Sequence, residues 1–148
     1  MFQIAYFSTA STPQDAKTVQ DILVSSRINN RRDDITGLLV AGGNRYLQVI
    51  EGPRQATDKL YATIRADERH LTVTTLLERT IPKRCFDGWS LAFRREPEIG
   101  QFASFPEMVR FLTLNVPDIA LRNQIRMFAR ALIMPVRAPG PALWRQAS

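Results

Sequence analysis

The chain has 148 residues, which is long enough for one domain with a hydrophobic core and too short for two comfortable ones. Hydrophobic residues make up 45% of it and charged residues 23%, an ordinary globular composition that argues against intrinsic disorder. Twenty Lys and Arg against fourteen Asp and Glu give a net charge of +6, which favours an anionic ligand or partner and leaves nucleic acid open.

The chain begins with a predicted strand over residues 2–8, in which alternation places Tyr6 on the inner face. Apolar residues then recur at helical spacing and predict a helix that ends near Asn30. Ile22, Ser26 and Asn30 lie on one stripe of that helix, so we expect them to face the same neighbour.

A strand over residues 35–40, a turn at 41–44 and a third strand over 45–52 predict a hairpin. Alternation puts Gln48 on the same face of the third strand as Tyr46. An amide inside an apolar strand needs hydrogen-bond partners, because an unpaired buried polar group costs about 1–3 kcal/mol. The sequence therefore predicts that something polar faces Gln48.

Pro53 opens a second predicted helix that ends near Asp67. A fourth strand is predicted over residues 71–81, and a fifth begins at Trp89 and runs to residue 93. The order βαββαβ with an added fifth strand predicts an α+β, ferredoxin-like sandwich, in which one antiparallel-rich sheet carries two helices on one face.

Two more helices are predicted within residues 102–134, one begun by Pro106 and the other by Pro117. Such a pair is suited to cover the free face of the sheet. Residues 135–148 hold three prolines and little periodic pattern, which predicts a flexible tail.

Catalytic motifs are scarce, because the chain has one histidine, one cysteine and no glycine-rich phosphate loop. We therefore do not expect an enzyme or a metal site. The single cysteine, Cys85, excludes an internal disulfide and fits a reducing compartment. The N-terminus does not read as a signal peptide, and no stretch approaches the roughly 20 apolar residues of a membrane span. These observations predict a cytoplasmic protein with no membrane partner.

Several segments match the motifs of one known family in order and in spacing. They are residues 6–8 (YFS), 26–30 (SRINN) followed by 35–39 (ITGLL), 48–53 (QVIEGP), 67–70 (DERH) and 86–90 (FDGWS). Each match is weak by itself, but together they make the chain resemble the BLUF family of bacterial blue-light sensors that bind FAD.

The resemblance implies a photosensory domain over residues 2–93 with the flavin ring edge-on between the first two helices. The implied photoactive residues are Tyr6, Gln48 and Trp89. The implied FAD contacts are Ile22, Ser26, Asn29, Asn30, Leu39, Tyr46, Gln48, Ile64, Arg69 and His70. In the implied mechanism Tyr6 gives an electron and then a proton by way of Gln48, whose amide hydrogen bonds are afterwards exchanged. The family often has methionine two residues after the tryptophan, and this chain has Leu91 there.

We read the chain as a short, stand-alone photoreceptor whose output passes through contacts made by residues 102–134. That reading implies a homo-oligomer and an unknown downstream protein partner. The alternative is a flavin-free ferredoxin-like interaction or nucleic-acid-binding module, which the charge and the row Arg122, Arg126 and Arg130 would suit. A solvated helix face accounts for that row more simply, so we do not expect a nucleic-acid partner. A small flavin reductase is disfavoured, because nothing reads as a nicotinamide site.

Overall fold

The computed structural model describes residues 1–11 and 15–134, so the predicted tail at 135–148 lies outside the described residues. Its elements in chain order are β1 (Phe2–Ala10), α1 (Ala16–Arg32), β2 (Thr36–Gly42), β3 (Arg45–Gly52), α2 (Arg54–Ala66), β4 (His70–Thr80), β5 (Ala92–Arg95), α3 (Phe105–Leu112) and α4 (Ile119–Ile133). This order confirms the predicted α+β arrangement of a βαββαβ unit, a fifth strand and two further helices.

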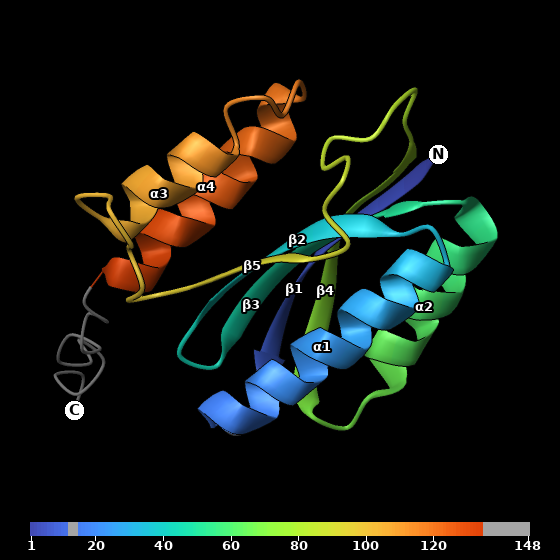
Figure 1. Cartoon of the computed structure of the whole chain (residues 1–148), viewed down its shortest axis with the longest axis horizontal. Helices are drawn as coiled ribbons and strands as arrows, with labels where there is room; N and C mark the ends of the chain where they lie inside the picture. The colour runs from blue at the N-terminus through green and yellow to red at the C-terminus, as the bar shows by residue number, and fades with distance from the viewer. Residues whose placement is uncertain (12–14, 135–148) are drawn as a thin grey trace, which may run out of the picture.

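The strands form one sheet in the order β4-β1-β3-β2-β5 (Figure 1). The β1–β3, β1–β4 and β2–β3 pairs are antiparallel, as in the predicted ferredoxin-like plan. The added strand β5 lies at the edge and runs parallel to β2. Strands β1 and β3 each have a strand on both sides, so their side chains are flanked by those of two neighbouring strands.

Helices cover both faces of the sheet (Figure 1). On the face of α1 and α2, a core cluster contains Ile4, Tyr6 and Ile50 together with Tyr61 of α2. The opposite face holds a larger cluster that joins strand residues to α3 and α4. Its buried members are Ala5, Leu38, Val40, Leu47, Val49, Phe86, Phe105, Met108, Val109, Val116, Leu121, Ile125, Phe128 and Ala129. The last two helices therefore complete the core.

Polar side chains fix where α3 and α4 begin. Ser104 accepts a hydrogen bond from the backbone N–H of Glu107 and caps α3, which starts one residue before the predicted Pro106. Asp118 caps α4 by accepting from the N–H of Leu121 at 2.6 Å. Because this cap follows Pro117, α4 begins two residues later than predicted. Among residues 1–11 and 15–134, none of the helices has the length and hydropathy of a membrane span.

The fifth strand was predicted from Trp89, and this boundary is wrong. Gly88 has a positive φ of 78°, and the N–H of Trp89 donates to the carbonyl of Phe86, so the chain turns at this point. The carbonyl of Trp89 accepts one hydrogen bond from the N–H of Gly37 in β2, but the regular parallel ladder begins where Ala92 lies opposite Leu38. Trp89 consequently belongs to the β4–β5 connection, residues 81–91.

Candidate functional site

A pocket of about 170 Å³ lies between the sheet and the pair α1 and α2. Its walls come from β1, β2 and β3, from both helices and from the segment that links α2 to β4. The lining residues are Tyr6, Ser8, Ala10, Ile22, Leu39, Tyr46, Gln48, Ile64, Asp67, Arg69 and His70. Most of the residues predicted to contact FAD are thus gathered from distant parts of the chain into one pocket.

Tyr6 and Gln48 form a buried pair in this pocket. They lie directly opposite each other across β1 and β3, and the hydroxyl of Tyr6 donates to Oε1 of Gln48. Their side chains are enclosed, with exposed fractions of 2% and 9%. Burial, followed by the nearby Tyr61, raises the pKa of Tyr6 far above its usual value. The phenol therefore keeps its proton and holds the carbonyl end of the amide, which leaves the NH₂ end to a ligand.

Two polar atoms in the pocket are buried without a partner among the described residues: Oγ of Ser8 and Nδ1 of His70. Buried polar groups are normally hydrogen-bonded, so such atoms point to a missing partner. Ile22, Leu39 and Ile64 add apolar walls to the same space. A planar ligand with a polar edge satisfies both features, and an isoalloxazine ring is such a ligand. The residues present fit a flavin.

Charged side chains stand at the mouth of the pocket. Arg69 binds Asp67 through a 2.5 Å ion pair, and this hydrogen-bonded contact lowers the pKa of Asp67 to about 2. The Arg69 side chain is more than half exposed, so its guanidinium is also open to solvent. Burial is the main cause that lowers the pKa of His70. These groups can meet the polar part of a cofactor that extends beyond the ring.

We expect acidification to destabilise the wild-type protein more than a His70→Gln variant. Since burial lowers the pKa of His70 in the folded state, the unfolded chain binds more protons once the pH falls through the ordinary histidine value of about 6.5. The contribution of His70 to stability is complete above that pH and is lost below it. Thermal unfolding midpoints of FAD-free protein on either side of that pH measure the effect. Equal losses in both proteins would contradict it.

Three predicted contacts from α1 do not line this pocket. Asn30 is buried, and its Nδ2 donates to the carbonyl oxygen of Ser90 at 2.7 Å, which ties α1 to the β4–β5 connection. Ser26 is half-buried. Asn29 is exposed and lines a separate surface pocket of about 400 Å³ between α1 and α2. Contact of these residues with FAD stays a prediction.

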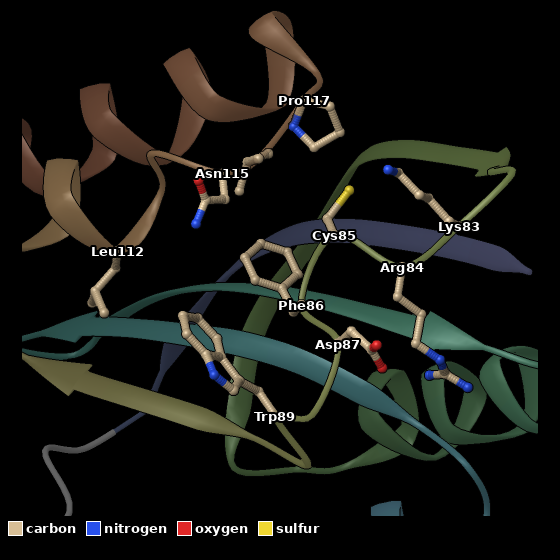
Figure 2. A pocket seen from close by; sticks show the side chains of 10 residues that line it. Lys83, Arg84, Cys85, Phe86, Asp87, Trp89, Leu112, Asn115 and Pro117 are labelled. Atoms are coloured by element: carbon tan, nitrogen blue, oxygen red, sulfur yellow. The ribbon is translucent and has the colours of Figure 1, made fainter.

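Trp89 lies on the other side of the sheet from Tyr6 and Gln48. Its ring packs against Phe86, with centroids 5.9 Å apart, and against the core cluster beneath α3 and α4. Figure 2 shows it in a second pocket, of about 440 Å³, formed by the β4–β5 connection and the α3–α4 loop. Leu91, at the position where the family often has methionine, is buried. This position gives Trp89 the surroundings of a packing residue.

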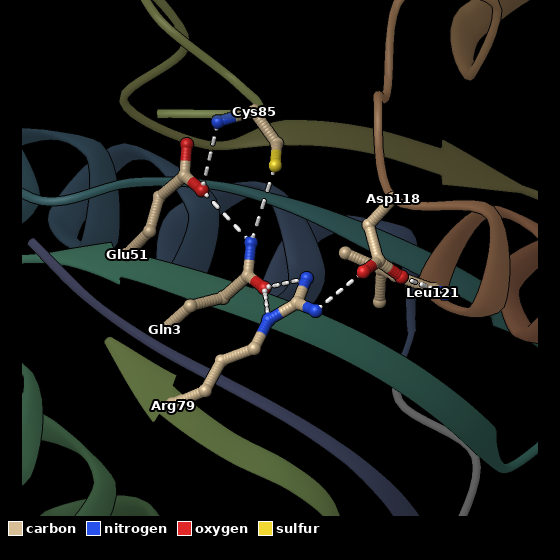
Figure 3. Close-up of polar contacts among 6 residues, drawn as sticks. All are labelled: Gln3, Glu51, Arg79, Cys85, Asp118 and Leu121. Atoms are coloured by element: carbon tan, nitrogen blue, oxygen red, sulfur yellow. Dashed lines mark hydrogen bonds and ion pairs between the residues drawn. The ribbon is translucent and has the colours of Figure 1, made fainter. Parts of the chain in front are cut away.

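Sequence reasoning missed a buried polar cluster centred on Glu51 (Figure 3). Its carboxyl group is fully buried and accepts four hydrogen bonds: from Gln3 Nε2 at 3.1 Å, Cys85 N at 3.1 Å, Phe86 N at 2.6 Å and Thr36 Oγ1 at 3.2 Å. Glu51 therefore anchors the β4–β5 connection to β3. The available signal was a charged residue on the same strand face as Leu47 and Val49.

No group of three or more His, Cys, Asp or Glu side chains in the described part of the chain is placed to hold a metal ion.

Comparisons with known proteins identify the family of this chain. The family model for sensors of blue light using FAD, BLUF, matches residues 1–92. The chain is 28% identical over 107 residues to photoactivated adenylate cyclase subunit beta of Euglena gracilis, a match covering 72% of this chain and 12% of that protein. It is 28% identical over 83 residues to the blue light- and temperature-regulated antirepressor BluF of Escherichia coli strain K12, covering 56% and 21% respectively. The chain thus spans only a small part of these relatives.

Solved structures give the same result. The dark-state structure of BlrB, a BLUF protein, superposes with a TM-score of 0.65 at 28% identity, covering 88% of this chain and 96% of that chain. A bacterial light-regulated adenylyl cyclase superposes with a TM-score of 0.66 at 27% identity, covering 88% and 35%. With a family model that matches more than half of its length, the chain belongs to the BLUF family of blue-light sensors that use FAD.

Proposed function

We propose that this chain senses blue light through FAD held in the pocket of Tyr6 and Gln48, and that these two residues carry the primary photochemistry. The carrying observation is their buried hydrogen bond, in which a phenol donates to an amide that also lines the pocket. A phenol can be oxidised, and a side-chain amide can exchange its donor and acceptor ends. The pair therefore has the chemistry that a hydrogen-bond switch needs.

The flavin, when bound, supplies blue-light absorption and an electron acceptor. Tyr6 gives up an electron and passes its phenolic proton to Oε1 of Gln48 along the existing hydrogen bond. The proton does not leave first, because an enclosed phenolate is unfavourable, as the raised pKa of Tyr6 indicates. It follows the electron, since the oxidised phenol is a far stronger acid than the phenol itself. When both return, the Gln48 amide is left rotated or tautomerised, so its hydrogen bonds to the flavin and to Tyr6 are exchanged. This exchange is a local switch that biases the surrounding structure.

We further propose that residues 2–93 sense light and that residues 102–134 pass the signal on through contacts with a second copy or another protein. Exposed apolar side chains on α3, on the α3–α4 loop and on α4, namely Phe111, Leu114 and Met127, support a contact role. The antirepressor among the relatives supports regulation of a partner protein. A cytoplasmic location goes with this proposal, supported by the lone Cys85.

A light-minus-dark absorption spectrum tests the proposal. Purified protein loaded with FAD is expected to be yellow and to show a red shift of its flavin band under blue light that reverses in the dark. Free FAD under the same lamp is the control. A colourless protein that takes up no added FAD would favour the flavin-free module, and a yellow protein with an unchanged spectrum would remove the switch.

A further inference from the structure

A continuous row of polar contacts crosses the sheet on the face opposite the pocket (Figure 3). Glu51, Gln3 and Arg79 lie opposite one another on β3, β1 and β4. Nε2 of Gln3 donates to Oε2 of Glu51 at 3.1 Å, and Oε1 of Gln3 accepts from Nε and Nη2 of Arg79 at 2.9 and 2.7 Å. The Gln3 amide thus joins an acidic group to a basic one through its two ends.

The row continues into helix α4. Nη1 of Arg79 donates to Oδ2 of Asp118 at 2.5 Å. The other carboxylate oxygen of Asp118, Oδ1, caps α4 by accepting from the N–H of Leu121. Asp118 therefore connects β4 to the first turn of α4, and a change in the position of Arg79 acts directly on the start of that helix.

The same two central strands carry the photoactive pair. Tyr6 lies opposite Gln48, and three residues further along the same strands Gln3 lies opposite Glu51. Because three is an odd number, the two pairs point to opposite faces of the sheet. A shift of β3 relative to β1 at the first pair is consequently felt at the second, although no side chain of one pair reaches the other.

The Gln3 amide cannot absorb such a shift by turning over. Its NH₂ end is required by the Glu51 carboxyl and its carbonyl end by the Arg79 guanidinium, so a reversed amide would set donor against donor and acceptor against acceptor. Hydrogen bonds weaken steeply with poor geometry, and a displaced strand must therefore move Arg79 or break a contact. The row is therefore a contiguous hydrogen-bonded network of the kind through which coupling between two sites can travel.

We propose that Gln3 and Arg79 are positioning residues that transmit a change at the Tyr6–Gln48 pair to the start of α4. This inference rests on the proposed function and adds its route across the sheet. If the row of polar contacts had only a structural role, it would stabilise the protein equally in darkness and in light. A transmitting row makes the light-induced change in α4 depend on Arg79.

Hydrogen exchange of the full-length, FAD-loaded protein in darkness and under blue light tests the proposal. In the wild type, amide protection in the first turns of α4 is expected to change by about fivefold or more on illumination, the usual lower end of allosteric coupling. Arg79→Met should keep the reversible red shift and lose the α4 change. Asp118→Asn keeps a good helix cap but lacks the full charge that holds Arg79, and should reduce the α4 change. Asp118→Asn also tests the same contact if Arg79→Met does not fold.

Arg32→Met is the matched control, because it removes an arginine whose ion pair with Asp33 is exposed and lies outside the row. It should retain both the red shift and the α4 change. A wild type that shows the red shift but no change in the amide protection of α4 would overturn the proposed transmission. An Arg79→Met variant that retains the α4 change, or that loses the red shift, would also overturn it. A wild type with no red shift would instead refute the proposed function itself, so the two failures are distinguishable.

Discussion

Tyr6→Phe is expected to leave FAD bound and to abolish the reversible red shift. Phenylalanine keeps the ring that packs beside Tyr61 at a centroid distance of 5.3 Å, so the pocket should keep its shape. The variant lacks the hydroxyl that donates to Oε1 of Gln48, and with it the proton that must follow the electron. The measurement is the light-minus-dark spectrum, together with the flavin-to-protein absorbance ratio as a check on binding.

Tyr61→Phe is the control for this experiment. It also removes one buried hydroxyl from the same cluster, but that hydroxyl pairs with Oγ1 of Thr75 and not with Gln48. We expect this variant to keep a red shift of wild-type size. If Tyr6→Phe retained the red shift, or if Tyr61→Phe lost it to the same degree, Tyr6 would not be the donor.

Glu51→Leu is expected to produce the largest loss of stability. Leucine fills a similar volume, but it leaves the N–H groups of Cys85 and Phe86 and the amide of Gln3 without their buried acceptor. Breaking a buried network in this way should lower the free energy of unfolding by about 3–5 kcal/mol. Urea unfolding of the FAD-loaded protein, followed by circular dichroism, measures the change. A loss of this size is a large share of the roughly 5–15 kcal/mol that stabilises a typical domain.

Glu78→Leu provides the comparison, because Glu78 is an exposed carboxylate on the edge strand β4. Exposed substitutions usually change the free energy of unfolding by no more than about 0.5 kcal/mol. Should Glu51→Leu unfold at the same urea concentration as the wild type, the four hydrogen bonds to Glu51 would have no net stabilising role, and the β4–β5 connection would have to be held by its apolar contacts.

The fold was predictable because each element carries a local pattern that agrees with its neighbours. Alternation in β3 correctly separated Tyr46 and Gln48 from Leu47 and Val49, since one face of a strand packs under α1 and α2 and the other under α3 and α4. The start of β5 was not predictable, because Trp89 and Ser90 read as strand residues. The turn at Gly88 and the anchoring of the preceding loop by Glu51 depend on contacts between distant segments.

The site was predictable in part for the same reason. Tyr6 and Gln48 follow from strand alternation once the strands are paired in register. The position of Trp89 required knowing which face the loop turns toward, and periodicity does not encode that direction. Alternation puts Glu51 on the strand face opposite Gln48, but the partners of Glu51 lie 15 to 48 residues away along the chain. A local sequence pattern does not predict such a network.

The helices that we propose as the output also close the hydrophobic interior, and this restricts how they can respond. Phe105, Met108, Leu121 and Ile125 are buried against the sheet, and exposing each would cost about 1.5–3 kcal/mol. Lifting the pair away would thus exceed the 1–3 kcal/mol that usually couples two sites. We therefore expect illumination to make the pair slide or tilt by small amounts while it stays packed against the sheet, as in a shear motion. With the helices still packed, no buried apolar surface becomes exposed. A partner of this protein would therefore have to recognise a change in the angle of α3 and α4 and in their exposed side chains.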